Sequence, residues 1–153
     1  MRFLFVFVLA LLQSVAALAD PGSFPWKKGD SPPVIAGVSL GMSREKLEQV
    51  LGQPSQTQKL GEDGLALVFK PQGVIALWAP LDGVAIIYVQ TREAADIGGV
   101  RIGDSKAEVL SRWGMPSVIQ GPTAIYRAGS WGAVIRLDET NHVVQLSVGT
   151  LTP

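Results

Sequence analysis

The sequence predicts an α+β protein, a tandem repeat in which a short helical segment is followed by a three-stranded antiparallel meander, with the helices packed on one face of the sheet. Three observations predict this class. Residues 37–55 align with residues 99–117 without a gap. Each aligned segment carries helix start and stop signals, and each is followed by three strand-like runs separated by turn residues. We therefore place repeat 1 at residues 35–94 and repeat 2 at residues 95–153.

The first 19 residues have the pattern of a secretory signal peptide. A short basic start is followed by an apolar run at residues 3–12, and residues 17–19, Ala-Leu-Ala, are typical of a cleavage site. An uncleaved membrane anchor is the competing interpretation, but the run is shorter than the roughly 20 residues that span a bilayer. We expect an exported protein, periplasmic or secreted, with no membrane span after cleavage of residues 1–19.

Composition excludes several classes of function. The 153 residues include 13 Lys+Arg and 13 Asp+Glu, so the formal net charge is +0, and there is no cysteine. This balance gives no electrostatic basis for binding nucleic acid or an anionic membrane. Without cysteine the chain has no disulfides and no cysteine-linked lipid, so we do not expect a lipoprotein. We also expect no metal and no cofactor, because His142 is the single histidine and a metal site needs several ligands.

Residues 20–34 predict an irregular N-terminal arm. The segment contains Pro21, Pro25, Pro32 and Pro33, and proline is incompatible with the interior of regular elements. Trp26 lies within the arm and is a candidate for fixing it to the surface.

The two aligned segments predict two short helices with similar caps. Ser43 and Ser105 are N-cap residues, and Ser105 with Glu108 forms a capping box. Gly52 and Gly114 are suited to the positive φ of a C-cap. The seven identical pairs fall at turns, caps and core positions: Gly37/Gly99, Val38/Val100, Gly41/Gly103, Ser43/Ser105, Gly52/Gly114, Pro54/Pro116 and Ser55/Ser117.

Three strands are predicted after each helix, and their alternation predicts two distinct faces. The predicted runs are residues 65–70, 74–79 and 84–91, then 124–128, 133–138 and 143–150. We expect the helix-facing side to include Ala85 in repeat 1 and Val144 in repeat 2. The two repeats could share an interface or a continuous sheet.

The opposite, open face differs between the repeats. In repeat 2 it is mostly polar, with Arg127, Val134, Arg136, Gln145 and Ser147. In repeat 1 it is apolar, and an exposed apolar patch marks a contact site in many proteins. The candidate binding residues are Val68, Ile75, Leu77, Ile86 and Tyr88.

The helical motif resembles that of two known groups of proteins. Residues 41–54, G-M-S-x-x-x-L-x-x-x-L-G-x-P, resemble the opening helix of the SmpA/OmlA outer-membrane assembly lipoproteins. Residues 99–116 resemble the same motif in secreted tandem-repeat proteins of the β-lactamase-inhibitory-protein-like class. The resemblance covers about residues 35–150 and implies a helical pair against a small antiparallel sheet whose surface binds partner proteins. The chain departs from the lipoproteins by lacking their cysteine, and no inhibitor contact residue matches a motif here.

One serine has a sequence context typical of a hydrolase. Gly37-Val-Ser-Leu-Gly41 matches the G-x-S-x-G elbow. Its counterpart in repeat 2 has Arg101 where Ser39 stands, while both glycines persist, so the glycines indicate a structural turn. We expect the protein not to be an enzyme.

Two functions follow from the open face. We expect a non-enzymatic module that binds another exported or envelope protein, inhibitor-like or envelope-assembly-like. The alternative is a binder of a small ligand or cell-wall glycan, with Tyr88 and Trp131 stacking on sugars. A structural interpretation also remains, in which the N-terminal arm or the other repeat covers the apolar face.

Overall fold

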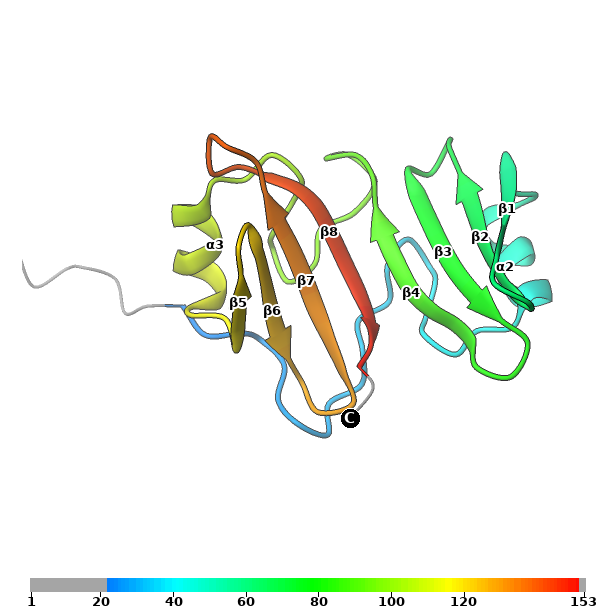
Figure 1. Ribbon diagram of the computed structural model, residues 1–153, viewed down its shortest axis with the longest axis horizontal. Coiled ribbons are helices and arrows are strands. Elements are labelled where there is room, and N and C mark those ends of the chain that lie inside the picture. The colour runs from blue at the N-terminus through cyan, green and yellow to red at the C-terminus, as the bar shows by residue number, and fades with distance from the viewer. Residues whose placement is uncertain (1–21, 152–153) are drawn as a thin grey trace, which may run out of the picture.

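The computed structural model describes residues 22–151, so the predicted signal peptide at 1–19 lies outside the described residues. The chain forms one eight-stranded antiparallel sheet and two short helices (Figure 1). The helices are α2 (Arg44–Leu51) and α3 (Lys106–Trp113). The strands are β1 (Gln56–Leu60), β2 (Gly64–Phe69), β3 (Val74–Ala79), β4 (Gly83–Val89), β5 (Val118–Gln120), β6 (Thr123–Arg127), β7 (Trp131–Leu137) and β8 (Val143–Thr150).

The sheet is continuous, in the order β1-β2-β3-β4-β8-β7-β6-β5. Strands β4 and β8 pair in its middle, with Ile87 opposite Val148. The predicted fold class is therefore wrong: the protein is predominantly an eight-stranded antiparallel sheet, with only eight residues in each helix, and not an α+β tandem repeat of three-stranded units. We refer below to β1–β4 and β5–β8 as the two halves of the sheet.

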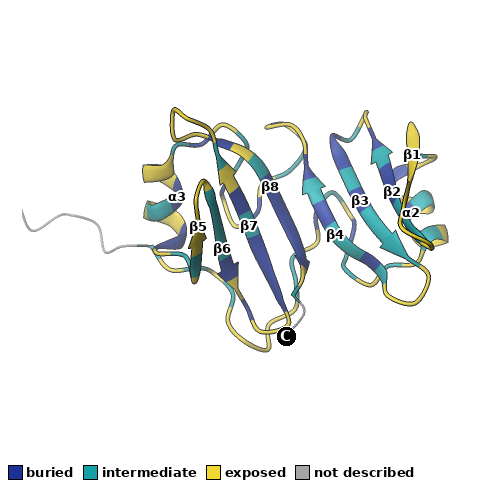
Figure 2. Cartoon of the chain, in the orientation of Figure 1, coloured by how far each residue is buried: buried dark blue, intermediate teal, exposed yellow. Residues whose placement is uncertain are grey.

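The two edge strands were not predicted, because neither has the alternation typical of a strand. Strand β1, Gln-Thr-Gln-Lys-Leu, is exposed at every position (Figure 2), so its residues need not alternate in polarity. Strand β5 has only three residues. Both are held by backbone pairing to a neighbouring strand, β1 to β2 and β5 to β6. A polar or very short edge strand also limits pairing with other chains.

Two β-bulges change which residues face the core. The pairing of β3 with β4 shifts between Leu77 and Trp78, and that of β7 with β8 shifts between Arg136 and Leu137. A bulge places two residues opposite one and reverses the alternation beyond it. As a result Val84 and Val143 are buried in the core, whereas the predicted core positions Ala85 and Val144 are half-buried and 51% exposed.

The predicted helix caps are confirmed. The Ser43 side chain accepts a hydrogen bond from the backbone N–H of Lys46, and Ser105 forms a reciprocal capping box with Glu108. Gly52 and Gly114 end the helices at φ values of 80° and 68°, where a side chain would be strained. The start and end of each helix are thus fixed by local chemistry.

The N-terminal arm has no helix or strand from residue 22 to residue 34, as its prolines predict. It passes the ends of β6 and β7 (Figure 1), and the backbone carbonyl of Asp30 accepts a 2.8 Å hydrogen bond from Trp131 Nε1. Phe24 packs edge-on against Trp113 of α3, with ring centroids 5.2 Å apart. The arm is therefore part of the packed structure.

Candidate binding surface

The strand register gathers the predicted binding residues on one face of the sheet. Residues two apart along a strand face the same side, and the core side is marked by Leu67, Ala76 and Ile87, which are fully buried. The predicted residues lie between these positions, on the opposite side, and all are half-buried. They are Val68 on β2, Ile75 and Leu77 on β3, and Ile86 and Tyr88 on β4.

The same apolar surface continues into the second half of the sheet. Tyr88 lies opposite Ser147, which lies opposite Val134. Val134 is followed across the sheet by Ile125 and Val118. We call the resulting surface the apolar stripe: Val68, Ile75, Leu77, Ile86, Tyr88, Val134, Ile125 and Val118. Its residues lie on six of the seven strands from β2 to β5, and on the seventh, β8, Ser147 stands between Tyr88 and Val134.

The open face of the second half is less polar than the sequence predicts, because Ile125 and Val118 also lie on it. Val118 lies on the short strand that the pattern did not predict. Ile125 stands between Ala124 and Tyr126, which face the core, so strict alternation along β6 is the signal that could have found it. Arg127 and Arg136 lie on the same face and border the stripe.

A shallow hollow of about 120 Å³ interrupts the stripe near the middle of the sheet. It exists because Gly132 and Gly149 present no side chains there. A Cβ placed on Gly149 would lie 3.1 Å from Ile86 Cγ1, so the glycine allows the Ile86 side chain to lie close over β8. Tyr88 and Ser147 line the same hollow, and Ser147 is 3% exposed.

The N-terminal arm packs on the other side of the sheet. The Phe24 ring centroid lies 5.2 Å from that of Trp113 and 5.3 Å from that of Tyr126, and the Trp26 centroid lies 5.6 Å from that of Trp131. All three partners are buried core residues. Within residues 22–151 the arm therefore does not provide the cover over the apolar stripe that the structural interpretation requires.

The same cluster removes Trp131 from the residues considered for sugar stacking. Its side chain is 3% exposed, and its Nε1–H donates a hydrogen bond to the Asp30 backbone carbonyl. Tyr88 is half-buried on the open face and remains the aromatic residue available there.

The residues considered for catalysis have structural contacts of their own. His142 Nδ1 lies 3.0 Å from Thr140 Oγ1, and the His142 backbone N–H donates to Asp138. Ser39 follows a tight turn in which Ala36 and Gly37 both have positive φ, and its backbone carbonyl accepts from Met42. Among the described residues no hydrogen bond joins Ser39 to His142, and no cluster of three or more His, Cys, Asp or Glu is placed to hold a metal.

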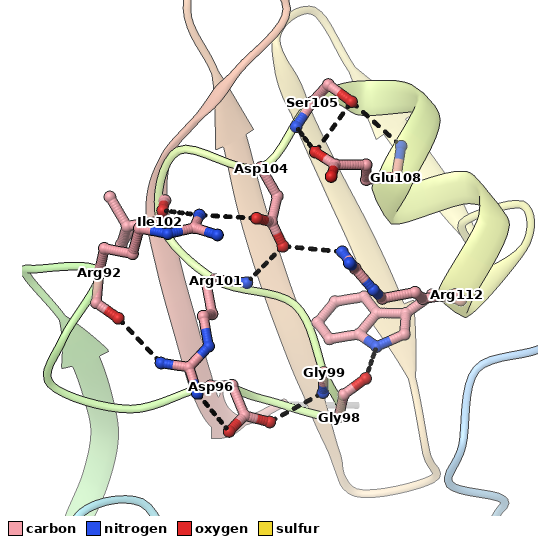
Figure 3. A network of polar contacts seen from close by, with 11 residues as sticks. Arg92, Asp96, Gly98, Gly99, Arg101, Ile102, Asp104, Ser105, Glu108 and Arg112 are labelled. Atoms are coloured by element: carbon pink, nitrogen blue, oxygen red, sulfur yellow. Dashed lines mark hydrogen bonds and ion pairs between the residues drawn. The ribbon is translucent and has the colours of Figure 1, made fainter.

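A buried carboxylate organises the segment that connects β4 to α3 (Figure 3). Asp104 is 2% exposed and accepts hydrogen bonds from Arg92 Nη1 at 2.7 Å, Arg112 Nη1 at 2.9 Å and the Arg101 backbone N–H at 2.9 Å. Arg92 comes from the loop after β4 and Arg112 from the last turn of α3. Asp104 therefore ties the two ends of the connecting segment together. The aligned position in the first copy is Met42, so the repeat itself gave no signal for this contact.

The electrostatic environment of Asp104 makes stability depend on acid pH. Burial raises the pKa of this carboxyl, but hydrogen bonds from Arg92 and Arg101 and the charge of Arg112 outweigh burial, so the net pKa lies below its ordinary value. The folded state then binds the proton less readily than the unfolded state. Stability from this group is present above the ordinary Asp pKa of about 3.9 and is lost as pH falls further.

We therefore expect the free energy of unfolding to fall as pH is lowered from about 4 toward 2. Urea titrations of the wild type and of Asp104→Asn at pH 6 and pH 3 measure the effect. The variant cannot titrate at this position, so it should lose less stability between the two pH values than the wild type does. Equal losses in the two proteins would contradict the assignment to Asp104.

Comparison with solved structures identifies proteins whose fold is similar to that of this chain. No family model and no curated protein matches the chain. A cysteine-rich secretory protein from Staphylococcus aureus is similar in structure at a TM-score of 0.64 and 16% identity, over 86% of this chain and 50% of that one. An extracellular protein containing an SCP domain from Bacillus anthracis has a TM-score of 0.59 and 14% identity, over 80% and 47%. A DUF4309 family protein from Bacillus subtilis has 0.55 and 10%, over 80% and 88%.

These similarities concern the fold alone. This chain spans about half the length of the first two proteins. None of the three is described as an outer-membrane assembly lipoprotein or as a β-lactamase inhibitor. In residues 22–151 no helix is long and apolar enough to cross a membrane.

Proposed function

We propose that this is an exported, non-enzymatic protein that binds another exported or envelope protein through the apolar stripe. The observation that carries the proposal is the continuity of the stripe: eight half-buried apolar residues lie on one face across both halves of the sheet. Contiguous apolar patches on soluble proteins are typical of interaction sites. The resemblance of residues 41–54 to the outer-membrane assembly lipoproteins and of residues 99–116 to the inhibitory-protein class supports a partner of either kind.

The geometry of the stripe suits binding of a preformed partner. Its strands, apart from the edge strand β5, are paired on both sides, so the surface is held rigid before contact and little conformational entropy is lost on binding. Tyr88 lies at its centre, beside Ile75 and Ile86, and tyrosine is enriched among the residues that dominate binding energy. Arg127 and Arg136 provide a charged border, as in interfaces with an apolar centre and a polar rim.

Site-specific photocrosslinking in a cell that exports the protein tests the proposal. A photoreactive residue at Ile75 or at Val134 should crosslink to the same protein, since both positions lie on the stripe. The same residue at Lys59, which lies on the exposed edge strand β1 opposite Leu65 on the core side of the sheet, is the control and should give no such product. Crosslinks only to a second copy of this chain, or equal products at all three positions, would argue against a distinct partner on this face.

We expect Tyr88→Asp to weaken binding of the crosslinked partner by at least about 30-fold, which corresponds to the roughly 2 kcal/mol of a central aromatic contact. Surface plasmon resonance with the purified pair measures it. Lys59→Asp, on the polar edge strand, is the matched control and should leave the dissociation constant unchanged. Equal affinity for wild type and Tyr88→Asp would show that the stripe is not the contact surface.

A small ligand or cell-wall glycan is the alternative occupant of the same face. The hollow of about 120 Å³ favours it, because Tyr88 offers an aromatic surface next to polar Gln145 and Ser147. Calorimetric titration with peptidoglycan fragments distinguishes the two functions. Saturable heat that disappears in Tyr88→Ala would support glycan binding, and the absence of heat at millimolar fragment would leave the protein partner as the better assignment.

A further inference from the structure

An apolar pocket of about 200 Å³ lies on the core side of the sheet, beside α3. Val109 and Leu110 of α3 line it, together with Met115. Ile119 of β5 and Ala124 of β6, which pair in the sheet, line it as well. Met115 is 73% exposed and Ile119 is 61% exposed, so the pocket is reached past two large apolar side chains at its rim. This site is separate from the apolar stripe, which occupies the opposite face.

The pocket exists because the second half of the sheet has a small residue where the first has a large one. Leu67 lies opposite Ala76, which lies opposite Ile87 of β4. In the second half Ala124 lies opposite Ile135, which lies opposite Leu146 of β8. Ala124 thus holds the place that a fully buried leucine holds in the first half. The difference between leucine and alanine leaves apolar space that neighbouring side chains fill only in part.

The pocket carries a single positive charge. Of the described residues that line it, Lys106 alone is charged, and no ion pair with Lys106 is found among residues 22–151. Its backbone is fixed at the start of α3 by a 2.8 Å hydrogen bond to the Asn141 carbonyl. An apolar cavity with one lysine at its mouth is complementary to an anion that carries an apolar tail.

We propose that this pocket binds a short fatty-acid anion, with the apolar tail in the pocket and the carboxylate at Lys106. The size limits the ligand, because pockets for drug-sized molecules hold about 300–1,000 Å³. This one is larger than the cavity of about 150 Å³ that takes up benzene in a Leu→Ala protein variant. A short aliphatic chain fits between these limits, and flexible Met115 can adjust over it.

Titration of the chain with octanoate tests the proposal. Methyl chemical shifts of Met115, Ile119 and Leu110 report occupancy, and calorimetry gives the dissociation constant. The wild type should show saturable shifts at these methyl groups. Ala124→Leu, which restores the residue type of the first half, should fill the pocket and weaken octanoate binding by at least about tenfold, with the thermal unfolding midpoint confirming that the variant is folded.

Two further variants distinguish binding of the apolar tail of octanoate from binding of its carboxylate. Lys106→Gln should weaken octanoate binding about two- to fivefold, as expected for an exposed ion pair, and leave binding of neutral octanol unchanged. Ile119→Glu places a negative charge at the exposed rim and should weaken octanoate more than octanol. Octanoate shifts absent from Met115 and Ile119, or unchanged binding in both Ala124→Leu and Ile119→Glu, would overturn the site. Equal effects of Lys106→Gln on octanoate binding and octanol binding would contradict the placement of the carboxylate at Lys106.

Discussion

Replacement of Asp104 by alanine is expected to lower the free energy of unfolding by about 3 kcal/mol, because it removes a buried acceptor that three donors share. This loss is at the lower end of the range for breaking a buried ion pair, because the Arg92 and Arg112 side chains are 53% and 41% exposed and can be solvated by water. The Arg101 backbone N–H loses its acceptor and cannot turn away. Urea denaturation at pH 7 measures the loss.

Asp96→Ala is the matched control for this prediction. Asp96 belongs to the same connecting segment, but its side chain is 44% exposed and its ion pair with Arg101 is 3.5 Å long (Figure 3). We expect a loss of less than about 1 kcal/mol there. Similar losses in the two variants would mean that the segment tolerates rearrangement and that Asp104 is not its organising contact.

The contrast between these residues explains what the sequence could predict. Helix caps depend on neighbours within four residues, so Ser43, Ser105 and their glycines were predictable from spacing. The Asp104 contacts reach Arg92 and Arg112, 12 and 8 residues away. No local pattern encodes such contacts, and the alignment paired Asp104 with Met42. The strands that alternate were found, whereas polar β1 and three-residue β5 were not.

Alternation along the strands was enough to predict part of the candidate surface. The five residues on β2, β3 and β4 follow a regular period and were assigned to one face. The bulge beside Trp78 moved Val84 into the core and Ala85 out of it. Alternation along β6 could have assigned Ile125 to this face, whereas Val118 lies on the three-residue strand β5, which has no such pattern. That both extend the same surface depends on which strands become neighbours. The apolar pocket beside α3 depends on the same register, because Ala124 becomes distinctive only when the strand pairing places it where Leu67 lies in the first half.

The largest loss is expected for Trp113→Ala, about 4 kcal/mol, because a fully buried aromatic side chain is removed. Trp113 is 1% exposed, its Nε1–H donates to the Gly98 carbonyl at 3.0 Å, and its ring lies 5.0 Å from that of Tyr126. It is also the ring against which Phe24 of the arm packs. We therefore expect two effects: a lower free energy of unfolding in urea, and faster tryptic cleavage at exposed Lys27 and Lys28.

Trp26→Ala separates these two effects. Trp26 is half-buried and packs on Trp131 in the arm, so its removal should free Lys27 and Lys28 for trypsin while lowering the free energy of unfolding by less than half as much as Trp113→Ala does. If cleavage in Trp113→Ala stayed as slow as in the wild type, the arm would not depend on α3 for its position. Faster cleavage in both variants would show that the arm and α3 share one aromatic core. Because this core lies on the helix side of the sheet, the arm then leaves the open face uncovered.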